Sequence, residues 1–288
     1  MFLHKYQVIR SVYYAQRWRL KRALGIKDRP RNPVVDGDLD WAFERHLRLC
    51  RLLNQEIAAL RSESRKVACE IGCGDCLSSS DLLLGLGFEK IYLVEHQPIV
   101  IDERQRQLLA RLATQTDLPN ALDSIEKDNP DRLNPRIEHI PSFFEDSNVP
   151  EQVDLIFSND VLEHVEDLET FFVRCKQMLK PHGVMVHKFD LSGHEFFEDP
   201  IPPLDFQTYP DWLYQLMFPK FRRSCRWLLD EIVAHARFAG FQTFQTRIIR
   251  AADIGYTRSI HPQLRSKARA RTVDQLLPLD VVITFSCG

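Results

Sequence analysis

Short apolar runs that alternate with amphipathic segments limit the fold of this chain more than any other feature. Residues 66–73 read KVACEIGC, which is typical of a buried strand that ends at a glycine turn. Further strands are expected over 91–95, 136–140, 153–159, 183–191, 241–250 and 281–285, and helices over 39–62, 77–86, 98–113, 167–180 and 225–239. This alternation predicts a doubly wound, mostly parallel α/β sheet with helices on both faces.

Three features between these elements carry their own expectations. Pro98 suits the first turn of the helix over 98–113. Residues 114–135 are polar and rich in Pro and Asn, which predicts a long surface connection. The basic run 258–271 is expected to be a solvated connection before the last strand.

Charge and hydropathy exclude several classes of protein. The 288 residues carry a formal net charge of −2, so no nucleic-acid partner is expected. No apolar run approaches the ~20 residues that cross a bilayer, and residues 1–10 lack a secretory signal pattern. Seven cysteines, an odd number, suit reduced thiols. These observations predict a cytoplasmic protein, whose oligomeric state the sequence leaves open.

The N-terminal segment differs in charge from the rest of the chain. Residues 1–31 hold nine Lys/Arg and one acid, Asp28, so this segment carries +8 and the remainder −10. We therefore divide the chain into a basic extension, 1–35, and a main domain, 36–288. Aromatic and aliphatic residues are interspersed with the cations. This pattern fits a solvated helix packed loosely on the domain, or peripheral contact with the anionic inner face of a membrane.

A glycine-rich turn follows the first strand and points to a cofactor. Gly72 and Gly74 allow a tight turn between strand and helix, and Glu95 ends the next strand, 23 residues beyond Gly72. The carboxylate of Glu70 would repel a pyrophosphate but suits an ammonium group. Leu77 occupies the place of the third glycine of a dinucleotide-binding turn. S-adenosylmethionine is therefore favoured over NAD or FAD, and a nucleotide-dependent oxidoreductase is disfavoured.

Two stretches resemble the class I S-adenosylmethionine-dependent methyltransferases. VACEIGCGD resembles their first motif, and residues 153–191, from VDLIFSND to VHKFDL, resemble the later part of the domain. Cys76 replaces a common third glycine, and His182 replaces the usual glycine before Gly183. The resemblance covers residues 64–191. Gly240-Phe241 and the final VVITF extend it to a Rossmann-like sheet of seven strands with a reversed last strand.

The resemblance also implies which residues hold the cofactor. Glu70, Gly72 and Gly74, with Cys73 between them, would line the methionine end, and Glu95 would hold the ribose. Ser142 would face the adenine, and Ser158 and Asn159 would lie beside the sulfonium.

Candidate catalytic residues follow the fourth and fifth strands. His187, Asp190 and His194 resemble a pattern in a subgroup of these enzymes associated with surface-polysaccharide and glycan biosynthesis. A His–Asp pair would supply a base and its orienting group. The alternatives are a divalent metal held by these three residues, or a His187 that faces the sheet. His164, with Glu163 beside it, lies near the expected methyl group or belongs to a packed turn.

An aromatic-rich insertion, 192–223, follows the fifth strand. Eight aromatic residues lie between 192 and 221, and five prolines stiffen the segment. The insertion would overhang the acceptor site, where aromatic faces suit sugar rings, or it would form a small satellite core. Arg222, Arg223 and Arg226 would meet an anionic group of the acceptor or form a solvated face.

Methyl transfer to a hydroxyl of a sugar or lipid-linked glycan is therefore the expected activity. The alternatives are methylation of a small molecule or a protein, or a non-catalytic binding module related to methyltransferases. No metal site is expected, because Cys73 and Cys76 lack a second ligand pair at suitable spacing.

Overall fold

A seven-stranded sheet forms the centre of the computed structural model, which describes residues 2–24, 38–59, 67–74, 76–119, 124–193, 202–218 and 224–286. The strand order is β5-β2-β1-β6-β7-β9-β8. β9 runs antiparallel to both of its neighbours, and the other pairings are parallel. The strands are β1 (Val67–Ile71), β2 (Lys90–Val94), β5 (Ile137–Ile140), β6 (Val153–Asn159), β7 (Leu179–Asp190), β8 (Thr243–Ala251) and β9 (Pro278–Ser286). The predicted fold class, including the reversed last strand, is confirmed.

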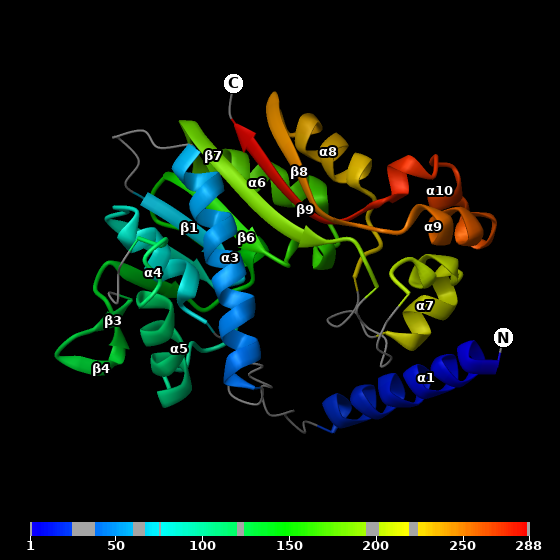
Figure 1. The fold of residues 1–288 in the computed structure, drawn as a ribbon, viewed down its shortest axis with the longest axis horizontal. Coiled ribbons are helices and arrows are strands. Elements are labelled where there is room, and N and C mark those ends of the chain that lie inside the picture. Colours follow the sequence, from blue (N-terminus) through cyan, green and yellow to red (C-terminus); the bar gives the residue numbers. More distant parts are fainter. Residues whose placement is uncertain are drawn as a thin grey trace.

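Helices cover both faces of this sheet (Figure 1). α3 (Leu39–Ala59), α4 (Ser78–Gly85) and α5 (Glu103–Ala113) lie on one face, and α6 (Leu168–Met178) and α8 (Leu229–Phe238) lie on the other. The strand β7 shows how the two cores divide. Val184 and Val186 join the core under α3 and α4, whereas Met185 and Phe189 join the core under α6 and α8.

Two connections differ from the sequence-based expectation. α5 begins at Glu103 rather than near Pro98, because the Asp102 carboxylate accepts a hydrogen bond from the Gln105 amide and caps the helix there. The predicted surface connection 114–135 contains a two-stranded ribbon, β3 (Ile125–Glu126) and β4 (Asn129–Leu133). Turn residues at 127–128 let this polar stretch pair with itself.

The expectation of a solvated connection over 258–271 is wrong. α9 (Ile254–Ile260) and α10 (Ser266–Arg269) lie here, with short 3₁₀ turns η5 (His261–Gln263) and η6 (Asp274–Leu276) beside them. Ile260, Leu264 and Ala268 are spaced by four residues and pack with Leu276 and Leu279 in a separate small core. The many cations of the run hid this apolar spacing.

The described part of the aromatic insertion forms a satellite core. η3 (Asp205–Thr208) and α7 (Asp211–Met217) contribute buried aromatic side chains, and α1 (Phe2–Ala23) packs against them through Val8 and Val12. The core residues are Phe206, Tyr209, Tyr214, Met217 and Phe218. Arg222 and Arg223 lie outside the described residues. The satellite-core interpretation is therefore confirmed for residues 202–218.

Arg226 holds this insertion to the main body. Its guanidinium is buried, donates hydrogen bonds to the Phe206 and Tyr209 carbonyls, and pairs with Asp211. Its backbone is left-handed, with a φ of 57°. The charge of Arg226 is therefore paired inside the protein, and the expectation of a solvated face is wrong for this residue.

In the described chain, no helix is both long and apolar enough to cross a bilayer.

Candidate active site at the carboxyl edge of the sheet

The carboxyl ends of the parallel strands meet at one edge of the sheet. In Figure 1 the arrowhead of β7 points to this edge, toward the side where α7 and α1 lie. The loops after β1, β2, β5 and β6 begin there. Ligands of open α/β sheets bind at this edge, so side chains at the ends of these strands are the candidates for contact with a ligand.

The glycine turn after β1 exposes bare backbone. Gly72 and Gly74 have φ angles of 69° and 62°, and the Gly72 amide donates to the Val94 carbonyl at 2.9 Å. A Cβ on Gly72 would lie 2.6 Å from Cγ2 of Val161, so the loop after β6 packs directly on this residue. A Cβ on Gly74 would meet nothing within 4 Å. Gly74 therefore leaves room for a ligand to approach the chain closely.

Glu95 joins the glycine turn to the end of β2. Its Oε2 accepts a hydrogen bond from the Gly74 amide at 3.1 Å, and its Oε1 accepts one from the Gln97 amide at 2.9 Å. His96 Nδ1 lies 2.8 Å from Oε1. A carboxylate oxygen accepts more than one hydrogen bond, so Oε2 retains a lone pair for a ligand hydroxyl. The residues present fit the ribose role that the sequence suggested.

His96 and Phe143 form a stacked pair beside Glu95, which the sequence analysis missed. Their ring centroids are 4.5 Å apart and their planes differ by 13°. Ser142, the predicted adenine-facing residue, is half-buried next to Phe143 and donates to its carbonyl. An aromatic face at this position suits a purine ring. The available signal was a histidine directly after the acid that ends the second strand.

Glu70 is turned into the protein rather than toward the open side of the turn. Its carboxyl accepts hydrogen bonds from the hydroxyls of Ser79 and Ser80, in the first turn of α4. Burial raises its pKa to about 7. Glu70 thus positions the turn and the start of α4. Cys73 packs on the core under α3 and α4, and burial raises the pKa of its thiol, so this side chain stays neutral.

His187 and Ser158 lie in the core, which agrees with the alternative in which His187 faces the sheet. His187 Nδ1 lies 2.7 Å from Ser158 Oγ, and both side chains are fully buried. Phe171, Phe172 and Phe285 surround the imidazole, and burial lowers its pKa to about 3. A neutral imidazole enclosed in this way has no access to an acceptor.

The predicted pair of His187 and Asp190 does not form. The two residues are three apart on one strand, so their side chains point to opposite faces of the sheet. Asp190 instead accepts hydrogen bonds from Ser192 and pairs with Arg250 at 3.1 Å. His194 lies outside the described residues. Geometry therefore excludes the simplest form of the predicted catalytic pair.

A row of alternating charges crosses the ends of β6, β7 and β9. Asp160, directly after β6, pairs with Lys188 and, at 3.5 Å, with Arg45 of α3. Asp280 lies 4.0 Å from Lys188 and 2.8 Å from Arg250. Asp160 has a φ of 55°, and its amide donates to the Lys188 carbonyl. Such strain at a strand end is common at functional sites, so Asp160 joins the candidates beside Asn159, which is half-buried.

The turn η2 (Leu162–His164) follows Asp160 and contains a buried acid. Oε1 of Glu163 accepts a hydrogen bond from the Asp190 amide at 3.2 Å, and Oε2 has no partner among the described residues. Burial, together with the charge of Asp160, raises the pKa of Glu163 well above its ordinary value. The next residue, His164, is exposed and stays a catalytic candidate.

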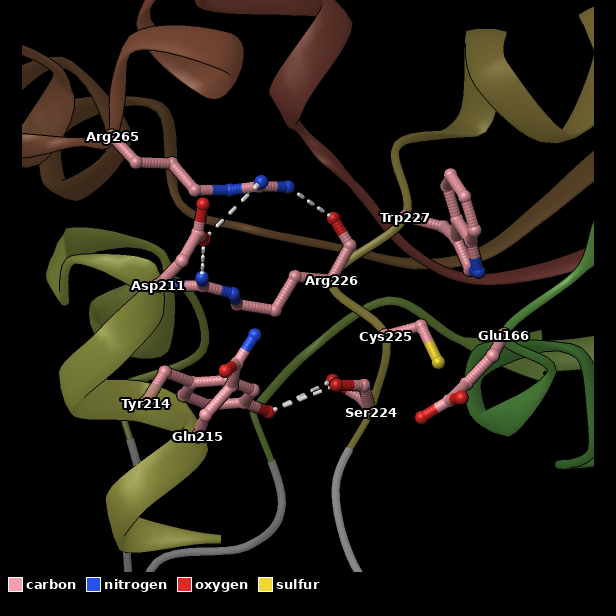
Figure 2. Close-up of a pocket in the computed structure, with 9 residues that line it drawn as sticks. All are labelled: Glu166, Asp211, Tyr214, Gln215, Ser224, Cys225, Arg226, Trp227 and Arg265. Carbon is pink, nitrogen blue, oxygen red and sulfur yellow. Dashed lines mark hydrogen bonds and ion pairs between the residues drawn. The ribbon is translucent and has the colours of Figure 1, made fainter. Parts of the chain in front are cut away.

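A polar cavity of about 250 Å³ lies beside η2 (Figure 2). The Cys225 amide donates to the Glu163 carbonyl at 2.6 Å, and Trp227 Nε1 donates to the Val165 carbonyl at 2.7 Å. These bonds hold one wall of the cavity against the turn. The lining residues are Glu166, Asp211, Tyr214, Gln215, Ser224, Cys225, Arg226, Trp227 and Arg265. Hydroxyl, amide and carboxyl groups thus share the cavity with two aromatic rings.

Within the described ranges, no three His, Cys, Asp or Glu side chains are arranged to hold a metal ion. The amine of Lys188 lies between the carboxylates of Asp160 and Asp280.

The two turn glycines should respond differently to alanine. Gly72→Ala combines an unfavourable positive φ with a clash against Val161, so we expect about 3 kcal/mol less stability. Gly74→Ala has the positive φ alone and should lose about 1 kcal/mol. Urea unfolding of both variants measures the difference. Equal losses would show that Val161 does not restrict Gly72.

The raised pKa of Glu70 predicts a pH-dependent stability. Its pKa is raised from 4.5 to about 7 in the folded chain, so the unfolded chain releases this proton first as the pH rises. The folded state then loses about 3 kcal/mol between about pH 4 and pH 8. Glu70→Gln cannot titrate, so its stability relative to wild type should rise by that amount over the same range. Urea unfolding at both pH values measures this change, and Ser79→Ala should move it to higher pH.

Comparison with known proteins gives an independent family match. Residues 69–185 match the family described as "Methyltransferase domain". The ubiquinone biosynthesis O-methyltransferase of Bradyrhizobium diazoefficiens is 26% identical over 137 residues, 48% of this chain and 45% of that relative. The match therefore spans about half the length of the curated relative.

Similar solved structures include two further methyltransferase-like proteins. One is a candidate O-methyltransferase from Nostoc punctiforme, with 15% identity and a TM-score of 0.46, covering 99% of this chain and 70% of that chain. Another is the N-methyltransferase NodS from Bradyrhizobium japonicum in complex with S-adenosyl-L-homocysteine, with 14% identity and a TM-score of 0.41, covering 84% and 85%. Residues 69–185 thus match a methyltransferase domain, and they lie in a sheet whose strand order brings the glycine turn beside Glu95 to the carboxyl edge.

Proposed function

We propose that this chain methylates a hydroxyl group of a sugar or a lipid-linked glycan. The observation that carries the methyl-transfer part is the bare backbone of Gly74 beside the carboxylate of Glu95. This pairing suits a cofactor that brings ribose hydroxyls and no phosphate. The family match over 69–185 supports the same activity.

The residues around the turn divide the work of binding. Glu95 accepts from the ribose hydroxyls, and the His96–Phe143 stack contacts the adenine ring. Asn159, at the end of β6, faces the methyl group. Glu70 and its two serine partners keep the turn in shape.

The cavity beside η2 supports a hydroxyl-rich acceptor. Trp227 contributes an aromatic ring to the lining, and Gln215, Ser224 and Glu166 contribute hydrogen-bonding groups. Flat rings with convergent polar groups are the lining that a sugar requires, because a sugar has both apolar faces and polar edges. The cavity begins one turn beyond the strand end at which the methyl group would lie.

S-adenosylmethionine supplies a methyl group that already carries a good leaving group. With the cofactor bound, the acceptor oxygen would take the methyl group, and the electron pair of the broken carbon–sulfur bond would stay on sulfur. The acceptor proton must leave to a base. His164 is exposed next to Glu163 and takes this role in the proposal. Asp190 is not the base in this proposal. It accepts a hydrogen bond from Ser192 and pairs with Arg250, and so holds the end of β7 in place.

A second candidate acceptor is a small molecule with a hydroxyl group. The curated relative is named as an O-methyltransferase of ubiquinone biosynthesis, which favours oxygen as the methylated atom. Protein methylation and a non-catalytic binding module stay as further alternatives. Transfer of radiolabelled methyl into separated cell fractions distinguishes these possibilities, because each predicts label in a different fraction.

Loss of the Glu95 carboxylate should weaken cofactor binding. Glu95→Ala removes a charged acceptor, so we expect affinity for S-adenosylhomocysteine to fall by about tenfold to a hundredfold. Isothermal titration calorimetry measures this change. Glu138→Ala, which removes an exposed carboxylate on β5, is the matched control and should bind like wild type. Absence of binding by the wild type would contradict the proposed activity.

The acceptor is found by transfer of radiolabelled methyl into cell fractions. We expect label in glycan or lipid-linked glycan, at a rate that Glu95→Ala lowers. Gln215→Ala should raise KM for that acceptor about tenfold and leave S-adenosylhomocysteine binding unchanged, because it removes one hydrogen bond in the cavity. Label in protein or in small molecules, with glycans unlabelled, would overturn the acceptor assignment.

A further inference from the structure

The helix α1 is attached to the body by one side. Ser11 and Ala15 are buried, and Val8 and Val12 contact the satellite core of the insertion. Arg19 donates hydrogen bonds to the carbonyls of Gln215 and Leu216, in the last turn of α7. A cation at the end of a helix also interacts favourably with its dipole. These contacts fix which side of α1 faces away from the protein.

The opposite side of α1 presents a second apolar stripe to solvent. Its members are spaced by four, seven and four residues, which places them on one helical face. Ile9, Tyr13, Leu20 and Leu24 are 69%, 60%, 60% and 65% exposed. Tyr14 lies beside them, with the guanidinium of Arg10 over its ring. This outer stripe is too regular to be scattered exposure of single residues.

Charge narrows the choice of what covers the outer stripe. Residues 2–24 contain six Lys/Arg and no Asp or Glu, whereas the chain beyond residue 31 has a net charge of −10. An anionic surface therefore attracts α1 and repels the rest of the molecule, which sets one orientation. A second copy of α1 on this face would bring the cations of two helices together. A nucleic acid would leave the aliphatic side chains without an apolar environment.

We propose that the outer stripe of α1 docks on an anionic lipid bilayer. Ile9, Leu20 and Leu24 enter the interfacial region, the tyrosine rings lie at headgroup depth, and Arg10, Arg17 and Lys21 contact lipid phosphates. α1 lies beyond α7 on the side to which β7 points (Figure 1). Docking thus turns the acceptor side of the domain toward the membrane, a consequence that rests on the proposed function and agrees with a lipid-linked acceptor.

Vesicle co-sedimentation of the full chain tests this docking. We expect wild type to pellet with phosphatidylcholine vesicles that contain phosphatidylglycerol, and much less with phosphatidylcholine alone. Added salt should release it, because headgroup attraction is screened. Ile9→Ser/Leu20→Ser should lower the partition coefficient by about tenfold or more, because two apolar side chains leave the interface.

A matched control keeps the test specific. Phe238→Ser/Ile248→Ser removes two exposed apolar side chains on α8 and β8, away from α1, and should bind vesicles like wild type. Unfolding midpoints should stay unchanged in both double variants, because the replaced side chains are exposed. Equal vesicle binding by wild type and Ile9→Ser/Leu20→Ser would overturn the proposal, as would no binding by wild type.

Two other outcomes separate competing explanations. If sedimentation equilibrium shows a dimer that Ile9→Ser/Leu20→Ser converts to a monomer, the outer stripe is a subunit interface and the docking proposal is wrong. Calorimetry with S-adenosylhomocysteine in solution reports on the proposed function separately. Both double variants should bind S-adenosylhomocysteine like wild type. If the wild type does not bind S-adenosylhomocysteine, the proposed function is wrong, but the vesicle result is unaffected.

Discussion

The two-residue repeat of the parallel strands decides which side chains at the carboxyl edge reach a ligand. Each central strand is covered on both faces, so successive residues enter different cores. On β7 this sends His187 into the aromatic core under α6, while Lys188 and Asp190 reach the other face and the row of charges. The position of a residue along the strand therefore decides whether its side chain reaches this edge, and only then does the residue type matter.

The loops at this edge are held to one another rather than to the strands alone. Val161 packs on Gly72, Glu95 accepts from Gly74, and the Cys225 amide reaches Glu163. Each contact joins segments far apart in the sequence. A cofactor bound between the first two pairs would lie close to the third, which opens on the polar cavity. These contacts connect the glycine turn to the cavity beside η2, where the proposal places the acceptor.

The aromatic insertion and the N-terminal helix explain one another. Four of the five described aromatic side chains of the insertion are buried in a satellite core, and α1 completes that core with two valines. Arg226 closes the other side, with its charge compensated by Asp211. Sugar recognition, in the proposal, then falls to the few groups that line the cavity. The other side of α1 takes no part in this packing and stays exposed.

The pattern of the chain was sufficient to predict the architecture. Strand–helix alternation, the glycine turn and Glu95 are local signals, because each depends on spacing within about 30 residues. β6 occupies 153–159, and α6 lies within 167–180, as expected. The ribbon at 125–133 and the small core over 254–279 were missed, because weak or highly charged segments gain their structure from neighbours.

The site was only partly readable. From sequence alone, the glycine turn and Glu95 could be placed at a ligand-binding edge, and the basic N-terminal segment could be seen to mix cations with aromatic and aliphatic residues. Only the tertiary structure decided that Glu70 and His187 are buried, that Asp160 joins a charge row, and that His96 stacks on Phe143. The physical reason is that burial and charge partners are set by contacts between distant segments, which a local pattern does not contain.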